Sequence, residues 1–195
     1  GRASSVTLIQ DQPNEKFYRI FANLNSPVDL RKFPFDRQSM QIMLEDRENT
    51  ADIVEYAPDY AGSGVDSSIA FPGWDIEGWN AEARQHYYQV YNESYSQYIF
   101  TVNVSKIALS SFIKTFLPVL LILLIVMLSL LLDTAHIPEI LAMSGSSLIA
   151  SVMFHISIAN QIPPVGYLTF ADIFMIITYI IILSAFIINT SVLGL

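Results

Sequence analysis

The sequence has no cysteine and little charge, and both shortages limit what the protein is. Without cysteine the chain has no disulfide, no thiolate metal site and no cysteine nucleophile. Charged residues make up 14% of the 195 residues, whereas a typical soluble domain has about 25%. Hydrophobic residues make up 52%, so a single water-soluble domain is not expected.

Charge is also unevenly distributed along the chain. After Lys106 the only charged residues are Lys114, Asp133, Glu139 and Asp172. The chain therefore divides into a polar half, residues 1–106, and a membrane half, residues 107–195. The net charge of −8 makes nucleic acid a poor partner, because phosphate binding requires clustered Lys and Arg.

Long apolar segments in the membrane half predict three membrane-spanning helices. Residues 115–132 read TFLPVLLILLIVMLSLLL and carry no charge, and their length is close to the roughly 20 residues that cross about 30 Å of hydrocarbon. Together with two later segments of similar length, the sequence predicts spans at about 107–132, 138–160 and 168–193. The connectors are short, which indicates a helical bundle in a lipid bilayer.

The second predicted span differs from the other two because it is rich in small polar residues. Residues 140–159, ILAMSGSSLIASVMFHISIA, contain several serines, a glycine and a histidine but no charge. Serine and glycine within a span serve either close helix packing or the lining of a wet pathway. The segment alone favours neither interpretation.

The polar half predicts an antiparallel β-structure. Segments enriched in β-branched and aromatic residues, SVTLIQ, KFYRIFANL, SMQIML and SQYIFTVNVS, are separated by turn-forming clusters. Alternation along residues 98–104 predicts one buried and one wetter face. The P-loop, GxGxxG, GxSxG and HExxH motifs are missing, so the sequence does not predict an enzyme.

The segment 26–40, SPVDLRKFPFDRQSM, resembles the signature loop of the pentameric ligand-gated ion channels, the Cys-loop receptor family. Ser26 and Met40 stand where animal members have cysteines, and loss of both is typical of prokaryotic members. Further along, GWDIEGW and EARQHYYQVYNESYSQ resemble a strand and the ligand-capping hairpin of the family. SSLIASVMFHISIANQIPPVGYLTF resembles the pore helix, the linker and the start of the third span. The similarity covers nearly the whole chain.

The resemblance implies a fold in two parts. Residues 1–106 are expected to form an extracellular ligand-binding domain, an all-β immunoglobulin-like sandwich represented by its later strands only. Residues 107–195 are expected to form an α-helical transmembrane channel domain with three of the family's four spans. We therefore expect the sequence to be a fragment or an incompletely represented subunit.

Helical spacing of three and four from Glu139 defines a candidate pore-lining stripe, and the resemblance selects the same stripe. The stripe consists of Glu139, Ala142, Ser146, Ile149, Met153, Ile156 and Asn160. Periodicity alone does not choose it, because a competing polar stripe has the same spacing and consists of Ser144, Ser147, Ser151 and His155. We expect His155 to be a hydrogen-bonded packing residue.

Six of the seven residues of the candidate stripe have an expected role, and four of these six also have a simpler alternative. Five copies of Glu139 would form a carboxylate ring that favours cations, although an acid also suits the first turn of a helix through the macrodipole. Ala142 would make the narrow end small, and Ser146 would replace part of an ion's hydration. Rings of apolar side chains would close the pore by dewetting, and each of them alone also fits a bundle core: Ile149, Met153 and Ile156.

The resemblance also implies a gating interface at the membrane end of the β domain. In the family the loop Asp pairs with the cation before the first span, which corresponds to Asp36 and Lys106. Lysine lacks the planar bidentate contact of arginine, so a weaker pair is expected. Pro163 and Pro164 are expected to stiffen the linker. The predicted interface consists of Phe33, Pro34, Phe35, Asp36, Lys106, Pro163 and Tyr167.

Two further groups are candidate ligand sites. Tyr87, Tyr88 and Tyr91 in the hairpin would contribute an aromatic cage for a cationic amine, whereas tyrosines at strand ends commonly serve packing. Four acids after the third predicted strand would bind calcium or sense protons, unless they form a solvated acidic loop: Glu45, Asp46, Glu48 and Asp52.

These expectations describe a subunit of a homopentameric ligand-gated ion channel. It would be a multi-pass protein of the cell membrane, with its β domain extracellular or periplasmic. It would conduct monovalent cations in response to an unidentified agonist, calcium or protons, and no other cofactor is expected. The alternative is a membrane-anchored extracellular sensory or binding module without conduction.

Overall fold

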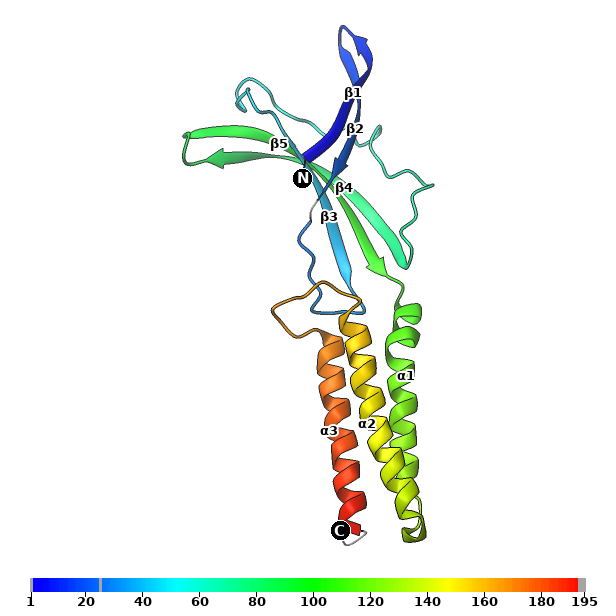
Figure 1. Ribbon diagram of the computed structural model, residues 1–195. Coiled ribbons are helices and arrows are strands. Elements are labelled where there is room, and N and C mark those ends of the chain that lie inside the picture. Colours follow the sequence, from blue (N-terminus) through cyan, green and yellow to red (C-terminus); the bar gives the residue numbers. More distant parts are fainter. Residues whose placement is uncertain (1, 25, 193–195) are drawn as a thin grey trace. The chain divides into compact units, whose positions relative to one another are not determined.

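The computed structural model of the protein describes residues 2–24 and 26–192 (Figure 1). Strands come first and long helices follow. In chain order the elements are β1 (Arg2–Gln12), β2 (Glu15–Asn23), β3 (Arg37–Glu45), β4 (Trp74–Tyr88), β5 (Glu93–Lys106), α1 (Ala108–Ser129), the short 3₁₀ helix η1 (Thr134–His136), α2 (Ile137–Ala159) and α3 (Phe170–Val192).

The described residues divide into two compact units that do not follow the order of the chain. The β unit consists of the described residues within Gly1–Val28, Gln38–Ile69 and Ile76–Val104. The helical unit consists of the described residues within Asp29–Arg37, Ala70–Asp75 and Ser105–Leu195. Two short segments of the polar half therefore belong, by their contacts, with the three helices.

The β unit contains two sheets. β1 and β2 pair antiparallel in a hairpin, with Val6 opposite Ile20 and Leu8 opposite Tyr18. The other sheet has the order β3-β5-β4, so β5 is its central strand. The predicted fold class, an all-β part followed by a helical bundle, is confirmed as strands in two sheets followed by three long apolar helices.

One prediction about β5 is wrong. Alternation predicted a buried face and a wetter face, with Ile99 and Val104 on opposite sides of the strand. Both side chains are buried. Because β5 is the central strand, side chains of strands on both of its edges can pack beside its own, and the Phe100 ring, for example, stacks on Trp79 of β4 with 5.5 Å between ring centroids.

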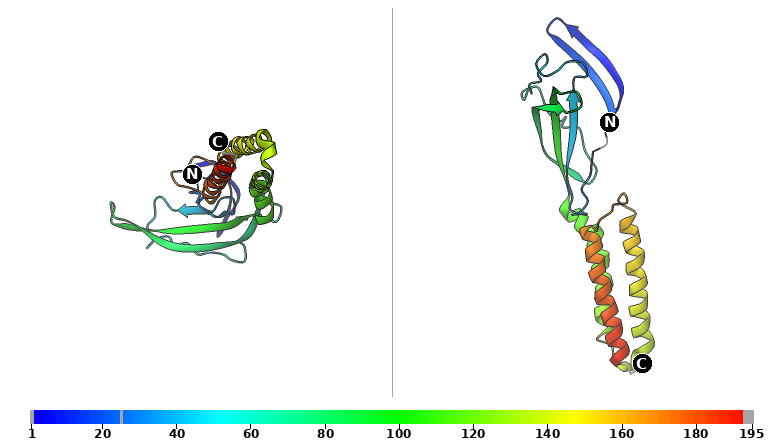
Figure 2. Two further views of the ribbon diagram at one scale, coloured as in Figure 1. Left: turned by 90° about the horizontal axis from the view of Figure 1, so that it is seen from below. Right: turned by 90° about the vertical axis from the view of Figure 1, so that its left-hand side faces the viewer.

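The helical unit is a three-helix bundle. α1, α2 and α3 each contact the other two helices (Figure 2), and each has 22 or 23 residues, enough to cross about 30 Å at 1.5 Å per residue. The helices lie within a few residues of the predicted spans. The last residue of the third predicted span, Leu193, lies outside the described residues.

A loop from the polar half completes the bundle at the start of α3. We call residues 29–37 the capping loop. Leu30 and Phe33 of this loop are buried with Val119, Ile158 and Met175 in one apolar cluster. The loop is therefore part of the core that holds the helices together.

Backbone groups of the capping loop also satisfy the first turn of α3, whose N–H groups have no partner within the helix. The Phe170 N–H donates to the Arg31 carbonyl (2.9 Å), and the Ala171 N–H donates to the Phe33 carbonyl (3.1 Å). The next two donors of this turn bond to Thr169, just before the helix: the Asp172 N–H donates to the Thr169 hydroxyl oxygen (3.2 Å) and the Ile173 N–H donates to the Thr169 carbonyl (3.1 Å). The loop and the helix are thus joined by main-chain hydrogen bonds.

Candidate functional site

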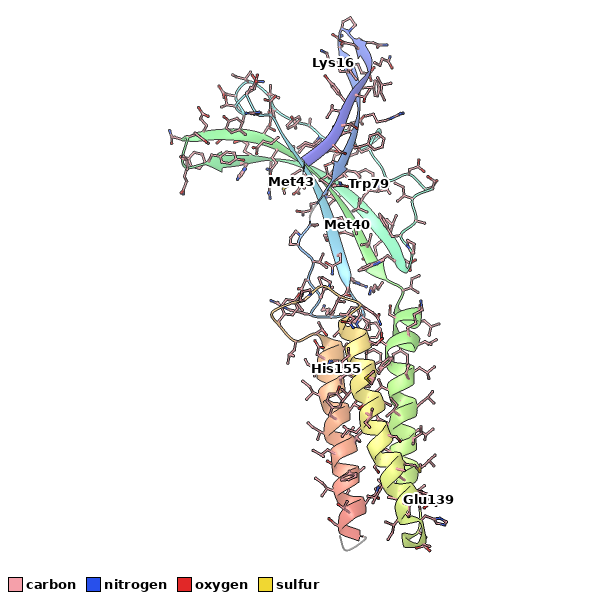
Figure 3. All side chains as sticks on the ribbon, viewed as in Figure 1. Lys16, Met40, Met43, Trp79, Glu139 and His155 are labelled. Carbon is pink, nitrogen blue, oxygen red and sulfur yellow. The ribbon has the colours of Figure 1, made fainter. Side chains whose placement is uncertain are left out.

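The structure shows which of the two candidate stripes of α2 is exposed and which is buried, a choice that periodicity left open. Every residue of the predicted pore-lining stripe is exposed in the single chain, including Ile149 and Met153, with 67% and 64% of their surface accessible. We call this set the exposed stripe: Glu139, Ala142, Ser146, Ile149, Met153, Ile156 and Asn160. Glu139 lies at one end of α2, and His155 near the other (Figure 3).

The competing stripe is the packing face of α2. Ser144, Ser147 and Ser151 are buried, and His155 is partly buried. Ser151 donates to the Leu148 carbonyl of its own helix (2.8 Å), as serines in apolar surroundings commonly do. The serines that suggested a wet pathway thus include three that serve packing instead.

At the Glu139 end, three uncharged side chains join the three helices. The amide of Asn189 in α3 donates to the hydroxyl oxygens of Ser129 in α1 (3.1 Å) and Ser144 in α2 (3.2 Å). The two serine oxygens lie 3.5 Å apart. We call Ser129, Ser144 and Asn189 the neutral cluster.

At the opposite end of α2, next to the linker to α3 (residues 160–169), a second cluster contains ionisable groups. We call this end the linker end. Nδ1 of His155 lies 2.9 Å from the hydroxyl of Tyr179, and Nε2 lies 3.1 Å from Oδ1 of Asp172. The prediction that His155 is a hydrogen-bonded packing residue is confirmed. We call His155, Thr169, Asp172 and Tyr179 the ionisable cluster.

Asp172 in the ionisable cluster also caps the first turn of α3. Its Oδ2 accepts from the N–H and the hydroxyl of Thr169, both at 2.8 Å, and its own N–H donates to Oγ1 of Thr169 (3.2 Å). This reciprocal pattern is a capping box. Asp172 therefore fixes the start of α3 and holds α2 through His155.

Asp36 in the capping loop is a buried carboxylate with unusual surroundings. Only 1% of the residue is exposed, and neither carboxylate oxygen has a hydrogen-bond partner among the described residues. Burial raises the pKa of Asp36, while attraction to Lys106 opposes the rise. A buried carboxylate without donors is costly to ionise.

Lys106 contacts the capping loop through its backbone and through aromatic rings. Its N–H donates to the Asp36 carbonyl (2.9 Å). Its ammonium lies 4.5 Å from the centre of the Phe33 ring and 5.4 Å from that of Trp74, a cation–π arrangement. Burial lowers the pKa of Lys106, against the attraction of Asp36.

The other predicted interface residues lie in the same unit. The Leu30 N–H donates to the Tyr167 hydroxyl (2.9 Å), and the Phe35 ring stacks on Phe116 at 5.8 Å. The peptide bond before Pro34 is cis. Pro163 and Tyr167 line an open cavity of about 480 Å³. The structure thus brings the predicted interface together around the capping loop, the linker and Lys106.

The sequence analysis assigned no role to three groups of residues: Trp74, Asn189 and the partners of His155. Trp74 stands at the start of β4 in the GWDIEGW segment, where only its place in the strand was considered. Asn189 and Asp172 are the most polar residues of their span, a signal that marks buried interhelical contacts.

The three hairpin tyrosines do not form one cage within the chain. Tyr87 and Tyr88 are consecutive strand residues, so they point to opposite faces. The Tyr88 hydroxyl donates to Glu45 (2.8 Å) and its ring lies 6.4 Å from that of Tyr91. The Tyr87 hydroxyl instead donates to Asn92 (2.7 Å).

Three of the four candidate acids, Glu45, Asp46 and Asp52, are directed at separate partners. Asp46 accepts from the N–H groups of Glu48 (2.8 Å) and Asn49 (2.9 Å), and these bonds lower its pKa. Asp52 accepts from the Thr50 hydroxyl, whereas Glu45 binds Tyr88. Among the described residues no group of three or more His, Asp or Glu is placed to hold a metal ion.

The fold and the site agree with the resemblance found in the sequence. No protein-family model matches the chain. Strands in two sheets, a buried loop of the FPFD type and three apolar helices long enough to span a membrane resemble the pentameric ligand-gated ion channels, and similarity to a known ion channel supports this resemblance.

The chain is a distant homologue of a proton-gated ion channel from Gloeobacter violaceus, to which it is 27% identical over 173 residues. The match covers 88% of this chain and 48% of the relative, so the chain spans about half the length of that protein. The relative is an ion channel and not an enzyme, in agreement with the prediction from the motifs.

Proposed function

We propose that the chain is part of a subunit of a homopentameric, cation-selective ion channel in which α2 lines the pore. The observation that carries the proposal is the division of α2 into two faces. Three serines of one face are buried, and one of them, Ser144, binds Asn189 of α3, while the exposed stripe has no covering helix within the described residues. Homology to an ion channel supports a water-filled pathway along this free face.

The exposed stripe suits conduction of monovalent cations. Five Glu139 side chains would place a ring of negative charge at one mouth, and acidic rings favour cations. Ala142 and Ser146 follow as small residues, of which Ser146 offers an oxygen to a partly dehydrated ion. Further along, three apolar residues would close the pathway by dewetting: Ile149, Met153 and Ile156.

Gating would act through the capping loop. Arg31 and Phe33 bind the start of α3 through their carbonyls, and Leu30 binds Tyr167 of the linker. Asp36 binds the backbone of Lys106, two residues before α1. A displacement of this loop would therefore move the linker, α3 and the start of α1 together.

Protons are the proposed stimulus among the agonists considered. The relative from Gloeobacter violaceus is proton-gated. Burial raises the pKa of Asp36, so this carboxyl gains a proton at a higher pH than an exposed aspartate. A neutral Asp36 attracts the Lys106 ammonium less, which would weaken one of the interactions between the capping loop and Lys106.

The test is cysteine accessibility during current recording from the complete subunit that contains this chain. The sequence has no cysteine, so each introduced thiol reports one position. Ser146→Cys is expected to react with a water-soluble methanethiosulfonate and change the current, whereas Ser147→Cys, one residue away on the buried stripe, is not. Equal reactivity at both positions would contradict the assignment of Ser146 to the pore-lining face and of Ser147 to the buried face.

The same recordings test conduction and selectivity. Glu139→Gln is expected to reduce the preference for cations, measured as a reversal potential in a salt gradient. An unchanged reversal potential would remove the role of Glu139. Absence of unitary currents from the unmodified subunit at varied pH, calcium and amine concentrations would instead favour the membrane-anchored binding module.

A further inference from the structure

The neutral cluster joins all three helices through one side chain. Asn189 is 6% exposed, and its amide nitrogen donates to α1 and α2 at once, through Ser129 (3.1 Å) and Ser144 (3.2 Å). An amide nitrogen has two hydrogens, so each serine oxygen receives one. A single amide group thus uses its full donor capacity in contacts between helices.

The serines of the cluster are placed to accept these bonds. The Ser129 hydroxyl donates to the Val126 carbonyl of its own helix (2.7 Å), which leaves its oxygen free to accept from Asn189. Ser129 and Ser144 are buried, and within a lipid bilayer no water replaces a lost partner. Movement of α2 relative to α3 at this level would leave an amide hydrogen without an acceptor.

The position of Ser144 on α2 connects the cluster to the exposed stripe. Ala142 and Ser146 stand two residues before and two residues after Ser144, and two helical residues are separated by roughly 200° of rotation. When Ser144 faces Asn189, Ala142 and Ser146 face away from the bundle. Rotation of α2 by one residue position, about 100°, would break the hydrogen bond between Asn189 and Ser144 and change which residues of α2 face outward.

We propose that Asn189 is a positioning residue for conduction. It fixes the rotation and depth of α2 at the Glu139 end, so that Ala142 and Ser146 face the permeating cations while Ser144 and Ser147 remain packed. The proposal rests on the proposed function, because it needs α2 to line a pore. It adds a residue of α3 that never contacts the ion.

The experiment measures the face that α2 presents, with and without the amide. In the complete subunit, Asn189→Leu is combined with Ser147→Cys, a reporter on the buried stripe that is not a partner of Asn189. The methanethiosulfonate reaction rate at Ser147→Cys is expected to rise tenfold or more, and the unitary conductance to become heterogeneous. Asn189→Gln keeps both donor hydrogens and is expected to keep the reporter slow.

Thr178→Val is the matched control on α3. Thr178 is buried like Asn189, but its hydroxyl donates to the Phe174 carbonyl of the same helix (2.9 Å). Its replacement is expected to leave the reporter rate and the unitary conductance unchanged. A rise as large as that for Asn189→Leu would mean that any lost buried polar group loosens α2, and would overturn the proposal.

The outcomes separate this proposal from the proposed function. Currents with an unchanged reporter rate in Asn189→Leu overturn the positioning role and leave the channel intact. Absence of current in the unmodified subunit overturns both. If Asn189→Leu does not assemble, Ser144→Ala removes one of the two acceptors, and a rise in the reporter rate of about threefold supports the proposal, whereas no rise overturns it.

Discussion

The two ends of the helical bundle are held by different chemistry. The neutral cluster at the Glu139 end has only hydroxyl and amide groups. The ionisable cluster at the linker end contains a histidine and a carboxylate, 3.1 Å apart. Both clusters bind the buried stripe of α2, but of the two only the ionisable cluster also caps the first turn of α3, through Thr169 and Asp172. The difference teaches that α2 is attached at one end through a single amide of α3 and at the other end through the residues that begin α3.

The largest expected effect comes from removing the acid of the ionisable cluster. Asp172→Ala leaves the Thr169 N–H, the Thr169 hydroxyl and His155 without their acceptor, which typically costs about 1–3 kcal/mol of unfolding free energy. The midpoint of thermal unfolding of the purified protein should fall by several degrees. Thr178→Val, which loses only a bond within its own helix, is the control; an equal fall in both variants would show that Asp172 has no special role.

A smaller effect should distinguish the two clusters by the contacts that each makes to α2. His155 contacts two side chains of α3, Tyr179 and Asp172, whereas Ser144 is one of the two acceptors of Asn189. His155→Ala should therefore lower the midpoint of thermal unfolding more than Ser144→Ala. An equal or larger fall for Ser144→Ala would break the comparison between the ends.

The smallest expected effect concerns Asp36, a third polar position with no hydrogen-bond partner for its carboxylate. Because burial raises its pKa, the folded protein binds more protons than the unfolded chain above pH ~4. The unfolding free energy contributed by Asp36 is therefore present at low pH and lost as pH rises through the raised pKa. Asp36→Asn should gain stability relative to the unmodified protein as pH rises from 4 to 7; a difference that moves the opposite way would contradict the assigned burial effect.

The sequence predicted most of what depends on local pattern. The spans, the strands and the spacing of the exposed stripe follow from runs and periods of a few residues. Periodicity did not say which stripe of α2 is buried, because that choice depends on Ser129 and Asn189 on two other helices. Family resemblance selected the exposed stripe as the pore lining, and that assignment stays a prediction; the structure shows that the serines of the other stripe are buried.

Other features depend on contacts that no local pattern contains. The resemblance found in the sequence predicted an ion pair between Asp36 and Lys106. It did not predict that the Lys106 ammonium lies over the rings of Phe33 and Trp74, because Trp74 comes from a distant segment. The assignment of the capping loop to the polar half followed the chain order, whereas its contacts are with the helices. The opposite directions of Tyr87 and Tyr88, by contrast, follow from strand alternation and were available from the sequence.

The main-chain hydrogen bonds between the capping loop and α3 have a consequence for mutational scanning. Phe170 and Ala171 donate from backbone nitrogens, and Arg31 and Phe33 accept with backbone oxygens, so a side-chain substitution at any of these positions leaves all four atoms in place. A scan of side chains would therefore pass over this connection. Replacement of the Phe170 or Ala171 amide by a backbone ester, which deletes the donor and keeps the side chain, is the substitution that would make it visible.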